Sequence, residues 1–242
     1  MKALRQAAGA VVAAAVLLAI GFALYAFVRS RPQDVPWAPL DLGQPVGMFT
    51  RAKLVDLRAD FDRCQALLDR AGVPHTALAP VSAGQCGYDD GVRFKAGGAR
   101  TIAYSPANLG VSCPVAAALA MWEWNVVQPA AQRHFGARVT RIDHLGSYNC
   151  RRLYGRDTGD YSQHATANAV DVSGFRIAGG ERVSVLDDWD DDGAKGSFLR
   201  EVRDGGCGLF ATVLSPDYNA AHADHFHLDQ ADRSGMAWGA CR

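Results

Sequence analysis

Two stretches of the sequence, Ser162-Gln-His-Ala-Thr-Ala-Asn-Ala-Val-Asp171 and His222-Ala-Asp-His-Phe-His-Leu-Asp229, contain the residues around which the chain is expected to fold. Three of the seven histidines fall within six residues of the second stretch. Side chains alternate along an extended strand, so His225 and His227 point to the same side and can both reach one point.

The first stretch supplies two further polar side chains. His164 and Asp171 are seven residues apart, an odd number, so a single flat strand would place them on opposite faces. A turn among the small residues 165–168 would let both converge. Two imidazoles and one carboxylate around an open fourth position are the ligands of a catalytic zinc, which activates a water there. We therefore predict a Zn²⁺ site formed by His164, Asp171 and His227; the alternative is a group of ordinary hydrogen-bonded side chains.

The N-terminal segment is apolar over a length that suits a membrane-spanning helix. Gln6 to Val28 comprises 23 residues without a charge, and about 20 such residues cross a bilayer as a helix. Basic residues flank it nearly evenly, so they orient it only weakly. We expect an uncleaved transmembrane anchor at residues 1–28. A cleaved signal peptide is the alternative, although its apolar region is usually about 7–15 residues long.

Six cysteines follow the apolar segment, and none forms a Cys-x-x-Cys pair. An even number of widely spaced cysteines suits three disulfides, which require an oxidising compartment. This favours a single-pass protein of the inner (cytoplasmic) membrane whose C-terminal domain lies in the periplasm or at the cell exterior; the alternative is six free thiols in a cytosolic domain. Fifteen pairings are possible, and sequence proximity suggests Cys64 with Cys86, Cys113 with Cys150, and Cys207 with Cys241.

Residues 29–48 contain four prolines and few apolar residues in periodic order, which predicts an extended spacer between the membrane and a domain over residues 49–242. Within the domain, apolar residues at helical spacing predict a helix over 51–71. A second helix is expected from Pro114 to about Gln128, where Pro129 would bend or end it. It is apolar on most sides, so we expect it to be the central helix of the core.

Short strands are expected between the helices. Residues 137–142 alternate in polarity as a half-buried strand does. Residues 169–172 and 208–214 predict further strands, with a helix over about 195–203 between them. This mixture predicts an α+β fold in which helices flank a small antiparallel sheet, stabilised by disulfides.

The charge balance excludes one class of partner. Twenty-five Lys and Arg residues balance twenty-five Asp and Glu residues, and no basic cluster is longer than Arg151-Arg152. Domains that bind nucleic acid normally carry a basic patch, so nucleic acid is not expected as a partner.

The two opening stretches also carry a resemblance. The motifs Ser-x-His-x6-Asp and His-x-His resemble those of the zinc D-alanyl-D-alanine peptidases, the penicillin-insensitive murein endopeptidases and the hedgehog signalling domains, which share one α+β fold. Residues from about Cys64 to Gln230 are more specifically similar to the extensin-like C-terminal family of bacterial proteins. This similarity also rests on Ser-Cys-Pro-Val-Ala-Ala-Ala-Leu-Ala from Ser112 and Asp-His-Leu-Gly-Ser-Tyr-Asn-Cys-Arg from Asp143.

Carried onto the matching positions, the resemblance implies the same three zinc ligands and places His225 beside the metal-bound water. The peptidases commonly have a glutamate three residues before the last ligand, where this chain has Asp224, whereas the endopeptidases use histidines at the places of His222 and His225. Strand alternation would point Asp224 away from the site. His225 is therefore the expected acid/base group, with His222 and Asp224 as further catalytic candidates.

Arg151 is the candidate substrate-binding residue, because an arginine upstream of the first ligand holds a substrate carboxylate in similar peptidases; an exposed arginine without that role is the alternative. Ser162 is expected to orient His164 through a hydrogen bond. The resemblance implies a zinc-dependent hydrolase, a peptidase that cleaves amide bonds in cell-wall peptidoglycan peptide. The alternative is a non-catalytic cell-wall binding or structural module whose zinc only stabilises the fold.

Overall fold

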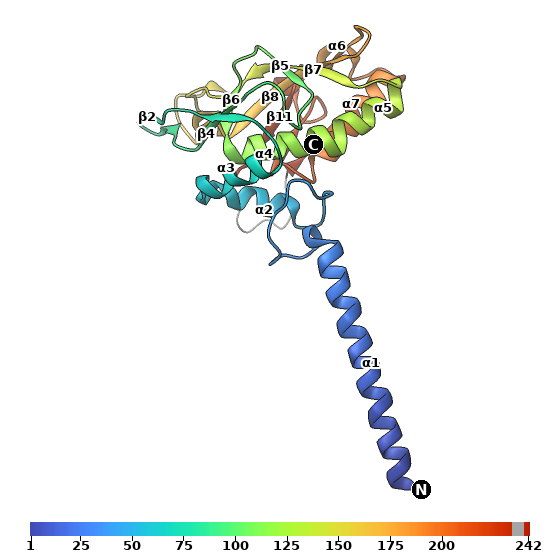
Figure 1. The fold of residues 1–242 in the computed structure, drawn as a ribbon. Helices are drawn as coiled ribbons and strands as arrows, with labels where there is room; N and C mark the ends of the chain where they lie inside the picture. The colour runs from blue at the N-terminus through green and yellow to red at the C-terminus, as the bar shows by residue number, and fades with distance from the viewer. Residues whose placement is uncertain (234–239) are drawn as a thin grey trace.

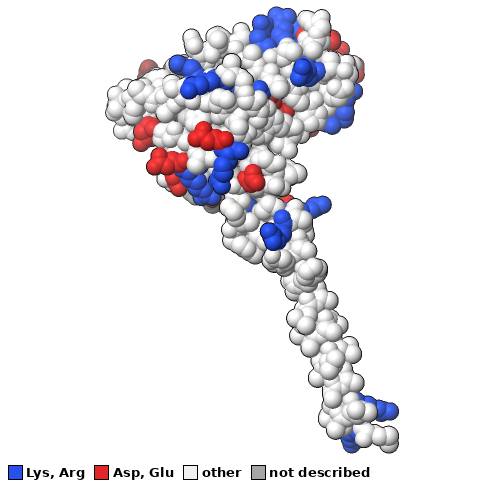
Figure 2. Space-filling view, in the orientation of Figure 1, with Lys and Arg blue, Asp and Glu red and all other residues white. Residues whose placement is uncertain are grey.

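The computed structural model describes residues 1–233 and 240–242. Helix α1 (Lys2–Ser30) projects from a globular head as a single straight rod with no buried residue (Figure 1). This helix is long and apolar enough to cross a membrane, a property that signal sequences share. Its surface is uncharged except at its two ends (Figure 2).

The segment that follows α1 differs from the expected extended spacer. It forms the short 3₁₀ helix η1 (Pro32–Asp34) and then folds back onto the head, where Leu40 and Leu42 are buried in the hydrophobic core. Its prolines do not hold it in an extended conformation because these apolar side chains gain more by burial. The head therefore begins immediately after α1 rather than at residue 49.

The first expected helix of the head is divided in two. Helix α2 (Thr50–Asp56) continues into the 3₁₀ turn η2 (Leu57–Ala59), and helix α3 (Phe61–Arg70) begins after Asp60. The Asp60 carboxylate accepts a hydrogen bond from the Arg63 N–H, so it caps α3 and starts a new helix inside the expected one.

The second expected helix is the central helix of the core, as predicted. Every residue of α4 (Cys113–Trp122) is buried. The helical segment does not end at Pro129: it continues from α4 through a π-helical turn, η3 (Glu123–Val127), into α5 (Gln128–Phe135). Proline lacks the N–H that the regular helix would need, and the wider turn accommodates it near the start of α5.

The main sheet has seven strands in the order β12-β10-β11-β8-β7-β5, with β9 paired to β8. Neighbours are antiparallel except β5 with β7 and β10 with β12, which are parallel. The sheet is therefore mixed, whereas a small antiparallel sheet was expected. Its strands are β5 (Ala103–Ser105), β7 (Val139–Gly146), β8 (Ala169–Ile177), β9 (Arg182–Ser184), β10 (Thr212–Leu214), β11 (Phe226–Asp229) and β12 (Ala240–Cys241).

The other strands form two smaller sheets. One has three strands in the order β1-β4-β6, and the other is the hairpin β2-β3. Their strands are β1 (His75–Ala77), β2 (Val81–Ala83), β3 (Cys86–Tyr88), β4 (Gly91–Phe94) and β6 (Gly110–Ser112). The remaining helices are η4 (Leu153–Gly155), η5 (Gln163–Thr166), α6 (Val185–Asp188), α7 (Ala194–Gly206) and η6 (Ala220–His222). The expected α+β fold class is thus confirmed.

The core lies between the main sheet and the central helix (Figure 1). Trp122 of α4 is fully buried, and its ring packs 5.9 Å from that of Phe175 on β8 and 6.2 Å from that of Phe210. Its indole N–H donates to the carbonyl oxygen of Val202 in α7. One large side chain therefore joins the sheet to two helices.

Three disulfides are present, but two of the three suggested pairings are wrong. Cys207 bonds Cys241 as suggested, whereas the other four cysteines pair as Cys64 with Cys113 and Cys86 with Cys150. Proximity along the chain does not select the partner, because α3 packs against α4 and brings together cysteines that are 49 residues apart.

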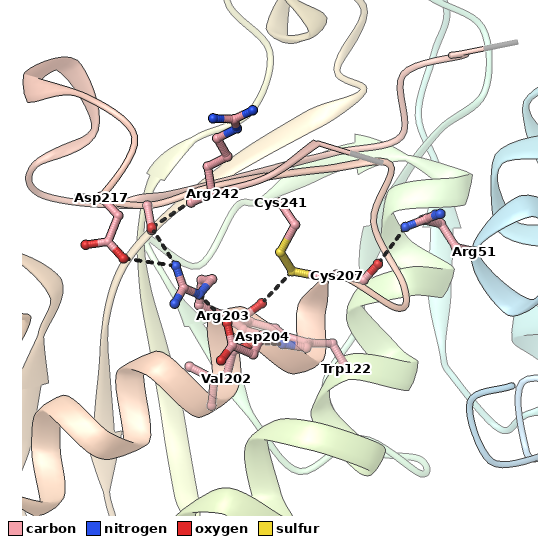
Figure 3. The surroundings of a disulfide bond; sticks show 10 residues. Arg51, Trp122, Val202, Arg203, Asp204, Cys207, Asp217, Cys241 and Arg242 are labelled. Atoms are coloured by element: carbon pink, nitrogen blue, oxygen red, sulfur yellow. Dashed lines mark hydrogen bonds and ion pairs between the residues drawn. A yellow bond between two sulfur atoms is a disulfide. The ribbon is translucent and has the colours of Figure 1, made fainter. Parts of the chain in front are cut away.

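The Cys207–Cys241 disulfide fastens the C-terminal strand β12 to the end of α7 (Figure 3). Arg51 of α2 donates to the carbonyl oxygen of Cys207, and the carbonyl oxygen of Arg242 accepts from Ser215. The C-terminus is therefore tied to both the helical layer and the main sheet.

Candidate metal centre

The structure brings the three predicted metal ligands together. Asp171 of β8 and His227 of β11 are directly opposite each other in the antiparallel pair, and His164 approaches from turn η5. His164 Nε2 lies 3.1 Å from Asp171 Oδ1 and 3.2 Å from His227 Nδ1, and the last two atoms are 3.0 Å apart. Ligand atoms about 2.0–2.1 Å from a tetrahedral zinc are separated by about 3.3 Å, so these distances suit one face of such a site.

The expected turn between His164 and Asp171 is present. Turn η5 ends at Ala167, whose φ of 54° is in the left-handed region. The side chain of Asn168 bridges it by donating to Gln163 Oε1 and accepting from Ser112 Oγ. This bridge holds a conformation that costs a non-glycine residue about 1–2 kcal/mol, and it places His164 over the sheet.

Each histidine ring uses its other nitrogen for a hydrogen bond to a fixed acceptor. His164 Nδ1 donates to the carbonyl oxygen of Ser147 at 2.6 Å, and His227 Nε2 donates to the Asp229 carboxylate at 3.0 Å. These bonds leave His164 Nε2 and His227 Nδ1 facing Asp171, where each can offer its lone pair to a metal once it carries no proton. The set therefore fits a divalent transition metal such as zinc, whose histidine ligands normally carry this kind of partner.

Sequence reasoning missed both of these acceptors. Ser162, the expected orienting residue, accepts a hydrogen bond from the backbone N–H of His164 rather than from its ring. Asp229 could have been found, because it lies two positions after His227 on a strand and so points to the same face. The Ser147 carbonyl carries no side-chain signal and is visible only in the fold.

The charges of the site depend on one another. Burial acts to raise the pKa of the Asp171 carboxyl, but hydrogen bonds from His164 and His227 outweigh burial and hold that pKa well below its usual range. Burial acts to lower the pKa of His227, but hydrogen bonds to Asp171 and Asp229 outweigh it and raise this pKa to about 9. Without a metal, His227 is therefore protonated at neutral pH, and a cation must displace that proton to bind.

The three catalytic candidates occupy different places around the predicted ligands His164, Asp171 and His227. His225 faces the site, with its Nε2 at 3.6 Å from Asp171 Oδ1. Asp224 is half-exposed behind it, with Oδ1 at 2.7 Å from His225 Nδ1. Asp224 therefore positions the His225 ring and does not itself reach the three predicted ligands.

His222 is part of the same cluster. Its ring lies 5.3 Å from that of His225 and 6.1 Å from that of His227, and Asn219 Oδ1 lies 2.8 Å from its Nδ1. Burial, followed by the positive charges of the neighbouring histidines, lowers the pKa of His222 to about 4. His222 is therefore a neutral imidazole at pH 7.

The site opens into a cavity of about 570 Å³. Arg151 lines this cavity, and its charge contributes to the lowered pKa of His222. The Cys86–Cys150 disulfide fixes the backbone beside Arg151, whose carbonyl oxygen accepts from the N–H of Ser162. The lining also includes three tyrosines, Tyr154, Tyr161 and Tyr218.

The fold and this site define a class: a disulfide-bonded α+β domain that follows an apolar N-terminal helix and gathers two histidines and an aspartate at the wall of a cavity. The family model for the extensin-like protein C-terminus matches residues 62–242, and the chain belongs to this family. No curated protein and no solved structure matches the chain.

Proposed function

We propose that this protein is a zinc-dependent peptidase that hydrolyses an amide bond in the peptide part of peptidoglycan. The observation that carries the proposal is the convergence of His164 Nε2, Asp171 and His227 Nδ1. The other nitrogen of each histidine ring donates a hydrogen bond to a fixed acceptor, the Ser147 carbonyl oxygen or the Asp229 carboxylate. Three ligands leave the fourth corner of a tetrahedral metal open, as catalytic zinc sites do. The resemblance to zinc D-alanyl-D-alanine peptidases and murein endopeptidases supports the same reading.

Zinc supplies Lewis acidity in such a site and lowers the pKa of a bound water toward about 7. His225 is placed to take a proton beside the ligands, and the Asp224 carboxylate holds its ring and would stabilise the resulting imidazolium. His222 is neutral and can donate or accept one hydrogen bond across the cavity. Arg151 offers two parallel N–H donors that match a substrate carboxylate.

We further propose that α1 remains as a single-pass anchor in the inner (cytoplasmic) membrane, with the head in the periplasm or at the cell exterior. Three disulfides persist only in an oxidising compartment, which supports this orientation. Peptidoglycan, the proposed substrate, is present in the same compartment.

One observation favours the alternative of a non-catalytic module in which zinc only stabilises the fold. Among the cavity-lining residues that the structure describes there is no glutamate, and Asp224, at the place of the glutamate that the peptidases commonly have, is turned toward solvent. In this alternative His225 has no role in catalysis, and the cavity binds wall peptide without cleaving it.

The test compares the full chain with a His225→Ala variant and with His134→Ala, a matched histidine change remote from the site. Zinc content is measured by elemental mass spectrometry, and fragments released from peptidoglycan are identified by mass. We expect one zinc per chain in all three proteins and a loss of hydrolysis of about 10²–10⁴-fold only in His225→Ala. One zinc per wild-type chain without any new fragment would reject the peptidase and leave the binding module.

A further inference from the structure

The junction between α1 and the head is held by hydrogen bonds, not by a free linker. Lys53 Nζ donates to the carbonyl oxygen of Pro32 at 2.8 Å, and the N–H of Phe49 donates to the carbonyl oxygen of Gln33 at 2.9 Å. The N–H of Met48 donates to Asp34 Oδ1 at 2.8 Å. An extended spacer of twenty residues would reach about 60 Å, whereas here the first residues after α1 are already bonded to the head.

The same junction exposes two apolar side chains. Trp37 and Met48 are 80% and 79% exposed, more than any other large hydrophobic residue of the described head. The next most exposed are Leu186 at 62% and Leu145 at 58%. Trp37 and Met48 are eleven positions apart in the segment that connects α1 to α2. This segment lies at the base of the head, beside the end of α1 (Figure 1). Both side chains are therefore free to contact another surface at the junction with α1.

The length of α1 places these side chains at the membrane boundary. Its 23 uncharged residues, Gln6 to Val28, extend about 34 Å as a helix, close to the about 30 Å of the hydrocarbon core. Arg29 and Arg31 follow directly and would reach the lipid headgroups. The base of the head begins there, without a tether that could lift it away.

We infer that the base of the head lies flat on the bilayer, with Trp37 and Met48 inserted among the lipid headgroups. Tryptophan is the residue that favours this interface most, because its ring is apolar and its N–H finds a polar partner there. Lipid is the occupant that the structure supports, since the surface is continuous with the membrane-spanning helix. The inference rests on the proposed anchoring of α1 but not on the proposed hydrolysis.

A consequence for the metal centre follows. Because the head rests on the membrane and cannot swing out on a spacer, the cavity with His225 and Arg151 stays at a constant distance from the bilayer. Only wall peptide at that distance from the bilayer can enter it.

The experiment places the full chain in phospholipid vesicles and measures how brominated lipids, which quench tryptophan at the headgroup boundary, lower its fluorescence. Helix α1 contains no tryptophan, so the signal comes from the rest of the chain, which has five. The variants are Trp37→Phe and, as a matched control, Trp189→Phe, whose ring is buried against Phe226. A double variant, Trp37→Phe with Met48→Trp, moves the reporter to the second contact.

We expect brominated lipid to quench a component on the order of one tryptophan in five. Trp37→Phe should abolish this component, Trp189→Phe should keep it, and the double variant should restore it. Equal quenching in wild type and Trp37→Phe, or none in either, would overturn the inference. The intact mass of the membrane-bound chain separates the causes: a chain that has lost α1 rejects the anchor, whereas an intact chain without quenching of Trp37 rejects only the docked base. Hydrolysis is not part of the readout.

Discussion

Replacing Asp229 with asparagine tests the assignment of the metal centre directly. Asp229 is buried, and its Oδ2 accepts the His227 Nε2–H at 3.0 Å, while its Oδ1 accepts from the N–H of Ala231. Asparagine keeps the shape and can still accept through its amide oxygen, but it removes the negative charge. The His227 ring then becomes a weaker donor of electrons to a metal at Nδ1.

The expected size of the effect follows from the place of this hydrogen bond behind a ligand. Loss of such a partner costs about 10- to 100-fold in metal affinity, which corresponds to about 1.4–2.7 kcal/mol. The zinc dissociation constant is measured by competition with a chromophoric chelator at pH 7.5. Asp224→Asn is the control, because Asp224 contacts His225 and none of the three proposed ligands.

The two variants should separate affinity from catalysis. Asp229→Asn should weaken zinc binding while Asp224→Asn leaves it within about twofold of wild type and lowers hydrolysis instead. An unchanged zinc constant in Asp229→Asn, with the fold intact by circular dichroism, would refute the assignment of His227 Nδ1 as a ligand atom.

Three further predictions concern pH, disulfides and packing. Hydrogen bonds to Asp171 and Asp229 outweigh burial and raise the pKa of His227 to about 9 in the metal-free protein. The residue therefore stabilises the metal-free fold fully below about pH 6.5, and this contribution is lost as the pH rises to 9. Zinc affinity changes in the opposite direction: it weakens as the pH falls, and the protein should bind little zinc below about pH 6. Removing the Cys86–Cys150 disulfide, which closes a loop of 64 residues, should lower the free energy of unfolding by about 4 kcal/mol in urea titrations. Trp122→Ala should lower it by about 3–5 kcal/mol, since the ring is fully buried and its N–H bond is lost.

Each of these has its own contrary result. Zinc occupancy that stays full at pH 4.5 would show that the histidines are not the zinc ligands. For the disulfide, tryptic peptides linked as Cys64 with Cys86 would show that the pairing itself is different. For the core, a melting temperature of Trp122→Ala within one or two degrees of wild type would mean that α4 is not central.

Local patterns in the sequence were sufficient for several elements. The mostly apolar sequence after Pro114 identified α4, polarity alternation over 137–142 located β7, and residues 169–172 were correctly expected to be a strand, the start of β8. The odd spacing of His164 and Asp171 required a turn, which is present as η5. Membership of the extensin-like C-terminal family followed from short motifs that the family model also matches. These features depend on residues close together in the chain, whose spacing is read directly.

The remaining features depend on contacts between distant segments. Only the fold showed that Cys64 meets Cys113, that Leu40 is buried in the core, and that the Ser147 carbonyl and Asp229 hold the two histidine rings. The sequence by itself determined which side chains could bind a metal and where the chain is apolar enough to cross a membrane. The tertiary structure decided which atoms of those side chains face one another and how close the head lies to α1, because these are set by the packing of helices and strands that are far apart in sequence.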